Sequence, residues 1–448
     1  METSASVEST TIGRRARADD RRNMRAVLNN VILHLHPARV PADAIRFTYT
    51  WGLGGISVVL GLMLGLTGVL LMFRYEPSVE RAYMSIQVLE TEVMFGSLVR
   101  AVHHWSANLL VVTTFLHLAR VFFTGGYKKG RATNWLIGVL LLVLVLAFNF
   151  TGYLLPWDQV AYWAITVSTS LIGYIPRLGS AFSDFVLGGP KVGQGALKNF
   201  YALHVAVLPV MLVMTASYHF WRVRKDGGIS QPEQPEGQRP ERVTTLPHLV
   251  RKEFAALAVV LAVVVLWGML MPAPLKELAD PTRSPNPAKA AWYFLGLQEL
   301  LLHMNTLAAM ALVAIVLALM LLLPRWDRQD EDIGIYFRSR AGRKAALAGA
   351  LLGLDLVPLM VIADEYWIDL PALLPATWPD DISSGLLPLL LTLAGLVVIY
   401  WIARRVSGGN RSEALVGLFL FLLVSLVVLT IIGVFFRGPN MALVQPTL

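Results

Sequence analysis

Long apolar runs without charge are the feature that most constrains this chain. A helix needs about 20 apolar residues to cross the roughly 30 Å hydrocarbon core of a bilayer. Nine such runs occur in the 448 residues, and eight of them contain no Asp, Glu, Lys or Arg. They are residues 50–73, 101–119, 134–157, 199–221, 254–275, 300–324, 345–363, 382–403 and 415–436. We therefore expect an all-α, polytopic membrane protein with about nine transmembrane helices.

The basic residues predict how these helices are oriented. Charged residues make up only 15% of the chain, and the net charge is +8. Cytoplasmic loops retain an excess of Lys and Arg. With the N-terminus inside, the inside segments hold 28 of the 38 basic residues. We expect a bacterial-type inner membrane location, a cytoplasmic N-terminus and an outer C-terminus. The positive charge then reflects topology and contact with lipid headgroups, and no nucleic-acid partner is expected.

Four histidines lie inside the apolar runs as two regularly spaced pairs. His103 and His117 are 14 residues apart, and His204 and His219 are 15 apart. About four helical turns separate the members of each pair. Both members therefore lie on the same face of their helix, about 21 Å apart along its axis. Both runs cross from outside to inside, which places His103 level with His204 and His117 level with His219. This pattern predicts two bis-imidazole b-type haems in a four-helix dihaem bundle. Buried polar residues bonded to other helices are the alternative.

Glycines repeat at the same spacing as the histidines. Gly54 and Gly68 are 14 apart in the first run, and so are Gly138 and Gly152 in the third. Glycine inside a helix costs about 1 kcal/mol relative to alanine. We expect these positions to leave room for macrocycles, with close packing of small residues between membrane helices as the alternative.

Two arginines and the absence of cysteine bear on the cofactors. Arg100 lies one turn before His103 and Arg120 one turn after His117, where each could pair with a haem propionate. The chain has no cysteine, which excludes covalent haem attachment and iron–sulfur ligation by thiolates in this chain.

Three stretches then resemble a known family. RAVHHWSANLLVVTTFLHLARVF, NWLIGVLLLVLVLAFNFTGYLLPWDQVAYWA and FYALHVAVLPVMLVMTASYHFWRVRKDGGIS resemble the cytochrome b of Rieske/cytochrome b complexes. TEVMFGSLVR and LPWDQVAYWA look like the plastoquinol–plastocyanin reductase form. The stretch ADPTRSPNPAKAAWYFLGLQEL resembles, more weakly, the subunit that follows in that form, here fused into one chain. The resemblance covers about residues 45–230 well, and the last three runs show no match.

The resemblance divides the chain into four parts and implies an activity. We expect a basic N-terminal segment (1–49), a haem-binding domain (50–230), a C-terminal quinol-site half (231–340) and three additional helices (341–448). The family implies bifurcated quinol oxidation at an outer site, electron transfer through two haems to an inner quinone site, and coupled proton translocation. It also implies a Rieske iron–sulfur partner, a c-type cytochrome or equivalent acceptor, and a homodimeric complex. The rival interpretations are a dihaem anchor that serves a peripheral dehydrogenase, and a transporter with buried histidines.

The resemblance also assigns residues to the quinone sites. Tyr153, Pro156 and Trp157 would border the outer site, and Trp292 and Tyr293 would complete it. Arg224 and Lys225 are candidates for the inner site. The alternative explanation for both is the ordinary excess of basic residues at the cytoplasmic edge of a membrane helix.

This sequence departs from the family pattern at two places. Ala290-Ala291 stands where the family has Pro-Glu before Trp-Tyr, so the carboxylate that helps remove a quinol proton is missing. Glu299 is a candidate substitute, and a snorkelling charge at a helix end is the alternative. The plastoquinol form attaches a further haem to a cysteine at the position of Gly52. Covalent attachment is excluded here, whereas an unattached third haem is not.

Asp355 is a charge in the middle of the seventh run. Such a charge costs about 2.5–3.5 kcal/mol on insertion scales unless it is paired or protonated. A proton path and a bond to a neighbouring helix are the two interpretations, and we favour the bond.

Overall fold

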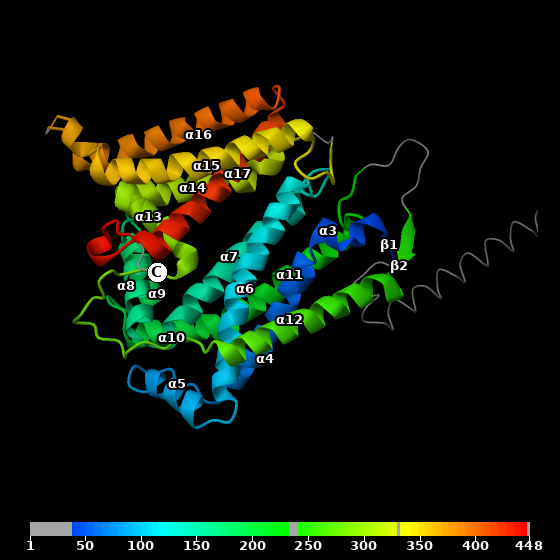
Figure 1. The fold of residues 1–448 in the computed structure, drawn as a ribbon. Coiled ribbons are helices and arrows are strands. Elements are labelled where there is room, and N and C mark those ends of the chain that lie inside the picture. The colour runs from blue at the N-terminus through cyan, green and yellow to red at the C-terminus, as the bar shows by residue number, and fades with distance from the viewer. Residues whose placement is uncertain (1–37, 233–240, 329–331, 376, 446–448) are drawn as a thin grey trace, which may run out of the picture.

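Nine long apolar helices dominate the computed structural model, which describes residues 38–232, 241–328, 332–375 and 377–445. Each is long and apolar enough to cross a membrane, so the expected all-α polytopic fold is confirmed (Figure 1). The nine are α4 (Leu53–Met72), α6 (Gly96–Phe123), α7 (Ala132–Leu154), α10 (Gln194–Ala202) continuing through η2 (Leu203–Val207) into α11 (Leu208–Lys225), η3 (Thr245–Leu249) with α12 (Val250–Leu270), α14 (Thr306–Trp326), α15 (Arg340–Tyr366), η5 (Asp381–Leu386) with α16 (Leu387–Val406), and α17 (Arg411–Ile431) with η6 (Ile432–Phe436).

The sixth span differs from the predicted run 300–324. A separate helix, α13 (Trp292–His303), ends before it, and Met304 is extended at φ −156° and ψ 160°. The Asn305 side chain then accepts a hydrogen bond from the Ala308 N–H and caps α14. A cap of this kind satisfies one of the free N–H groups at a helix start. The predicted start at residue 300 was therefore wrong, because continuous hydropathy hid a local break.

Helices α4, α6, α7 and α11 form the predicted four-helix bundle, and α12 lies against α4 and α6 (Figure 1). Leu60, Val111 and Val264 are fully or almost fully buried where α4, α6 and α12 meet. A polar contact between the hydroxyls of Ser57 and Thr113, at 3.1 Å, also crosses from α4 to α6.

Short elements close the two ends of the bundle. One end carries α5 (Ala82–Thr91), α8 (Gln159–Gly173), α9 (Gly179–Leu187) and α10. The other end carries α3 (Phe47–Thr50) and a two-stranded antiparallel sheet of β1 (Arg39–Pro41) and β2 (Arg242–Thr244). The all-α expectation did not include these two short strands.

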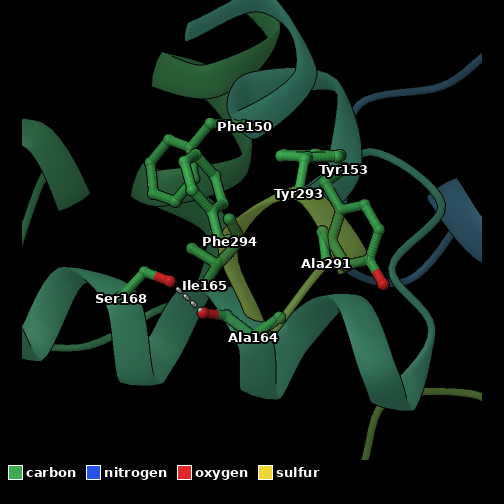
Figure 2. Close-up of a pocket in the computed structure, with 8 residues that line it drawn as sticks. All are labelled: Phe150, Tyr153, Ala164, Ile165, Ser168, Ala291, Tyr293 and Phe294. Carbon is green, nitrogen blue, oxygen red and sulfur yellow. Dashed lines mark hydrogen bonds between the residues drawn. The ribbon is translucent and has the colours of Figure 1, made fainter. Parts of the chain in front are cut away.

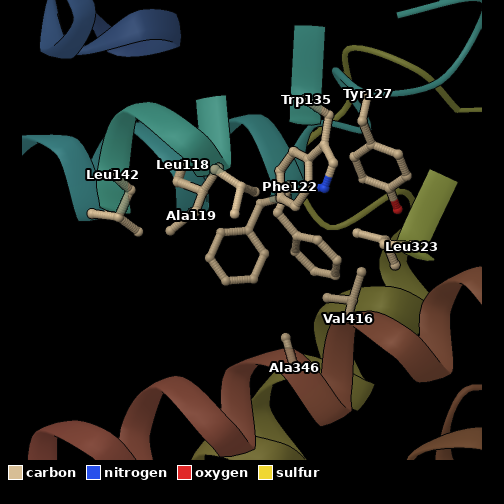
Figure 3. Close-up of a cluster of buried hydrophobic side chains, with 11 residues drawn as sticks. Leu118, Ala119, Phe122, Tyr127, Trp135, Leu142, Leu323, Ala346 and Val416 are labelled. Carbon is tan, nitrogen blue, oxygen red and sulfur yellow. The ribbon is translucent and has the colours of Figure 1, made fainter. Parts of the chain in front are cut away.

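The last three membrane helices pack as a second layer on the bundle. Helices α15 and α17 cross very closely, since a β-carbon added to Gly349 would lie 2.1 Å from the Gly417 carbonyl oxygen. An aromatic core joins this layer to the bundle, with Phe122 and Trp135 facing Val416 (Figure 3). The ring centres of Phe122 and Phe419 are 3.9 Å apart.

A buried ionic contact lies beside that aromatic core. Lys128, between α6 and α7, pairs with Asp327 after α14 at 3.2 Å, and both side chains are 1% exposed. Ser412, at the start of α17, donates to the same carboxylate at 3.0 Å. A buried pair tolerates little movement, because separating it would leave two uncompensated charges. The second layer and the bundle are therefore fixed together at this end.

Candidate functional site

The structure brings the two outer histidines together. His103 on α6 and His204 on η2 have ring centres 6.3 Å apart. Two metal–imidazole bonds of about 2 Å, with each ring centre about 1 Å behind its nitrogen, would place the centres about 6 Å apart. The observed separation therefore fits two axial ligands of one metal ion.

Two threonines determine which nitrogen of each histidine is free. Thr67 on α4 lies 2.9 Å from His103 Nδ1, and its hydroxyl donates to the Met63 carbonyl at 2.7 Å. With its one proton donated to the Met63 carbonyl, Thr67 would accept from Nδ1–H, and this tautomer leaves the Nε2 lone pair of His103 free. The free nitrogen is the one that can bind a metal ion.

Thr151 repeats this arrangement on α7. It lies 3.1 Å from His204 Nδ1 while its hydroxyl donates to the Ala147 carbonyl at 2.8 Å. The Nε2 of His204 is therefore free as well. A hydrogen bond of this kind fixes the tautomer and the orientation of a ligating imidazole.

Three of the four spaced glycines lie against the histidines. A β-carbon at Gly68 would lie 3.3 Å from His103, and one at Gly152 would lie 2.6 Å from His204. At the other end of the bundle, a β-carbon at Gly54 would lie 3.3 Å from His117. Their nearest neighbours within the chain are thus imidazole rings, and the room that we expect for macrocycles at these positions stays a prediction. No described atom lies within 4 Å of the corresponding position at Gly138.

The inner pair lies at the cytoplasmic end of the predicted topology. His117 and His219 are within range of a direct electrostatic interaction, and His219 Nδ1 is buried without a hydrogen-bond partner. Arg120 lies over the Tyr49 ring at 4.5 Å and donates to the Tyr49 carbonyl at 3.2 Å. Its Nη2 is buried and has no partner. This free donor is suited to an anionic group such as a propionate.

Arg100 has partners of its own. Its guanidinium bonds to Glu90 and donates to the Ala273 and Pro274 carbonyls at 3.0 and 2.6 Å. A propionate contact for Arg100 stays a prediction. In the structure, its N–H groups donate to carbonyls of the loop after α12.

Sequence reasoning missed an ion pair at the inner end. Asp226 follows α11 and pairs with Arg222 at 3.0 Å. Arg131 donates to the Asp226 carbonyl at 2.9 Å. The Nε of Arg222 and one carboxylate oxygen of Asp226 are buried without partners. The predicted inner-site residues Arg224 and Lys225 end the same helix, and the Lys225 ammonium lies 4.8 Å from the Trp221 ring centre. A carboxylate seven residues after His219 was the signal available in the sequence.

A pocket lies where the resemblance predicted the outer quinol site. Its cavity volume is ≈ 10 Å³. Side chains of α7, α8 and α13 and of the residue before α13 surround it (Figure 2). The predicted Tyr153 and Tyr293 both line it, together with Phe150, Ala164, Ile165, Ser168, Ala291 and Phe294. Burial raises the pKa of the Tyr293 hydroxyl, so this group stays protonated and can donate a hydrogen bond.

The other predicted outer-site residues lie near the pocket without lining it. Trp292 is 39% exposed, and its indole donates to the Asn108 side chain at 2.5 Å. Trp157 is buried among the outer helices. The neighbouring Asp158 has a structural role that sequence reasoning missed, because its carboxylate accepts from the N–H groups of Ala161 and Lys276 at 2.8 and 3.0 Å. Asp158 therefore caps α8 and ties it to the loop that leads into α13.

Glu299 does not line the pocket either. Its side chain is 0% exposed, and it accepts hydrogen bonds from Arg437 Nε and Nη2 at 2.9 and 2.6 Å. Burial acts to raise the pKa of Glu299, but His303 and Arg437 outweigh it and lower that pKa below its ordinary value. These contacts describe an ionised carboxylate in a buried ion pair, which is a poor acceptor for a quinol proton and is no snorkelling charge; the substitute role of Glu299 stays a prediction.

Known proteins resemble the part of the chain that holds all four histidines. The family described as cytochrome b/b6/petB matches residues 41–227. Cytochrome b6 of Acaryochloris marina (strain MBIC 11017) is 44% identical over 180 residues, which are 40% of this chain and 83% of that protein. Cytochrome b6 of Prochlorococcus marinus (strain NATL1A) is 44% identical over 180 residues, which are 40% of this chain and 82% of that protein.

A solved structure resembles most of the fold. A chain of a hyperthermophilic respiratory Complex III superposes with a TM-score of 0.63 at 22% sequence identity. The match covers 89% of this chain and 94% of that chain, so the likeness in fold extends well beyond residue 227. The long identity with the cytochrome b6 proteins, over most of their length, shows that this chain is a multi-pass membrane protein of the cytochrome b/b6 family.

Proposed function

We propose that the chain is the dihaem cytochrome b subunit of a quinol-oxidising bc-type complex. His103 and His204 would hold the outer b-type haem, and His117 and His219 the inner one. The observation that carries this assignment is the 6.3 Å separation of the outer imidazoles, together with two Nδ1 atoms that face threonine hydroxyls. When bound, the haems supply one-electron carriers at two depths of the membrane.

The histidine-bearing helices do the positioning in this proposal. Thr67 and Thr151 keep both outer Nε2 atoms available, and Gly68 and Gly152 let the imidazoles approach α4 and α7. At the inner end, the free Nη2 of Arg120 would neutralise an anionic substituent of the cofactor. An unattached third haem remains compatible with the residues present.

The outer pocket is the proposed site of quinol oxidation. Ligand pockets commonly measure about 300–1,000 Å³, and the cavity here has a volume of only ≈ 10 Å³, so it must widen when a quinol ring enters. The hydroxyls of Tyr153 and Tyr293 would hydrogen-bond the quinol oxygens. No carboxylate lines the pocket among the described residues, and a quinol proton must therefore leave through a hydroxyl, water or a partner protein.

The electrons then divide between two carriers. With no cysteine, the chain has no thiolate for an iron–sulfur cluster, so a Rieske protein would take the first electron and pass it to a c-type cytochrome. The second would cross the membrane to the inner quinone, near Arg224 and Asp226, where protons are taken up. We place the N-terminus on the cytoplasmic side and expect a homodimeric complex with bound lipid.

Quinol-dependent reduction of a c-type cytochrome by the purified complex tests this proposal. We expect reduction by wild type, and a raised quinol KM in Tyr293→Phe with an unchanged haem spectrum. A dihaem anchor would show the haem bands but no reduction without a peripheral dehydrogenase. A transporter would show no haem band. Either result would reject the proposed function.

A further inference from the structure

Asp355 has no partner within the described chain. It lies near the middle of the apolar stretch 345–363 on α15, and its side chain is exposed. No described residue hydrogen-bonds to it or pairs with it. The neighbouring helix that we expect Asp355 to bond is therefore not among the described helices of this chain. Charged residues inside membranes normally face a polar partner, because hydrocarbon offers none.

A second free acceptor lies beside this carboxylate. Pro358 has no N–H group, so the Leu354 carbonyl one turn earlier loses its helical donor. Leu354 is 53% exposed. The Asp355 carboxylate and the Leu354 carbonyl are thus adjacent acceptors on one exposed part of α15. A group with several N–H donors, such as an ammonium or a guanidinium, would satisfy both.

The surface around Asp355 is apolar and free of intrachain packing. Leu347 and Leu351, two turns and one turn before Asp355, are 61% and 49% exposed, and residues four apart share a helix face. Gly349 and Gly353 lie on a different face, where α17 packs closely. The face of Leu347, Leu351 and Asp355 is therefore available to something outside this chain.

We propose that this face binds a transmembrane helix of a different subunit, which presents a Lys or Arg side chain to Asp355 at mid-membrane depth. Lipid acyl chains offer no donor. A second copy of this chain, docked about a two-fold axis through the same face, would bring the two Asp355 carboxylates toward each other. Charge complementarity therefore favours a basic helix, and the inference does not depend on the haem assignments.

The subunit composition of the purified complex tests this inference. Without its charged partner, the helix should bind at least about tenfold more weakly, which corresponds to about 1.4 kcal/mol. We expect Asp355→Leu to lose one small membrane subunit while the haem absorbance per chain is unchanged, and Asp355→Glu to keep that subunit. Asp369→Leu, just beyond α15, is the matched control and should change nothing.

A photo-crosslinker at Leu351 in the otherwise native chain provides a second measurement. We expect it to capture the subunit that Asp355→Leu loses. Unchanged composition in Asp355→Leu would overturn the inference, and so would capture of lipid alone or of a second copy of this chain. Failure of the proposed function would be seen separately, as an absent haem band.

Discussion

Single hydroxyls control the chemistry of the outer histidines. Thr151 accepts from Nδ1 of His204 only because its own proton is bonded to the Ala147 carbonyl. An imidazole whose second nitrogen donates a hydrogen bond is a more basic metal ligand. In the proposed site, the threonine would therefore act on the haem through the histidine without touching the metal.

Replacing that threonine gives a prediction at this scale. We expect Thr151→Val to raise the midpoint potential of the outer haem, because a less basic imidazole stabilises the ferric state less. Its haem affinity should fall about 10–100-fold, and the inner haem should keep its potential. Potentiometric titration of the haem absorbance measures both. Thr114→Val is the control, since the Thr114 hydroxyl donates only within its own helix. An unchanged outer potential in Thr151→Val would refute the tautomer assignment.

Helix α13 lines the outer pocket and is held by the C-terminal layer. A β-carbon at Gly296 would lie 2.9 Å from the Leu426 carbonyl oxygen on α17. The Lys289 ammonium, just before α13, donates to the Val434 carbonyl at 2.9 Å. Arg437 then joins Glu299. These contacts give the last helices a role that their sequence did not reveal, because they position the outer site.

The ion pair of Arg437 makes that role testable. Arg437→Gln would remove the permanent cation that donates to the buried Glu299 and leave only His303 near it; breaking a buried ion pair costs up to about 3–5 kcal/mol, and α13 should shift. We expect a higher quinol KM in steady-state kinetics with an unchanged haem spectrum. Arg405→Gln on α16, whose guanidinium lies over Trp401, should behave like wild type. A wild-type KM in Arg437→Gln would show that α13 is held without the pair.

The stability of this cluster should depend on pH through His303. Its Nδ1 lies 2.6 Å from Asp364 and its Nε2 lies 3.7 Å from Glu299. Burial acts to lower the pKa of His303, but the two carboxylates outweigh it and raise that pKa above its ordinary 6.5. A raised pKa gives stability that is complete at low pH and is lost as pH rises through the raised value.

Thermal unfolding of the complex against pH measures this effect. We expect wild type to lose stability as pH rises above 6.5. His303→Gln should not show this alkaline decrease. Arg437 and Glu365 face the same cluster. The Glu299 contribution has the opposite sign. Its lowered pKa gives stability that is lost only as pH falls through that pKa. Identical alkaline limbs in the two proteins would contradict the role of His303.

At the scale of the whole molecule, the sequence predicted what depends on local periodicity. Hydropathy located the spans, and histidine spacing placed His103 level with His204. Contacts between residues far apart in the sequence could not be predicted from local patterns. Nothing local shows that Arg437 meets Glu299 across 138 residues, or that Arg100 is bonded by the loop after α12. The break at Asn305 was also hidden, because apolar residues continue through it.

The whole molecule is thus a four-helix bundle on which the C-terminal helices pack as a second layer. Lys128 donates to Ser412 at the start of α17 at one end, and Arg437, after α17, pairs with Glu299 on α13 at the other. The central claim is that these histidines act as two separate ligand pairs at two depths.

A redox titration of the haem α-band, with haem counted per chain, tests that claim most directly. The purified wild-type complex should hold two b-type haems with separate midpoint potentials. His103→Ala or His204→Ala should remove the outer haem alone and leave the inner potential in place. Retention of both haems in these variants, or fewer than two haems in wild type, would contradict the pairing.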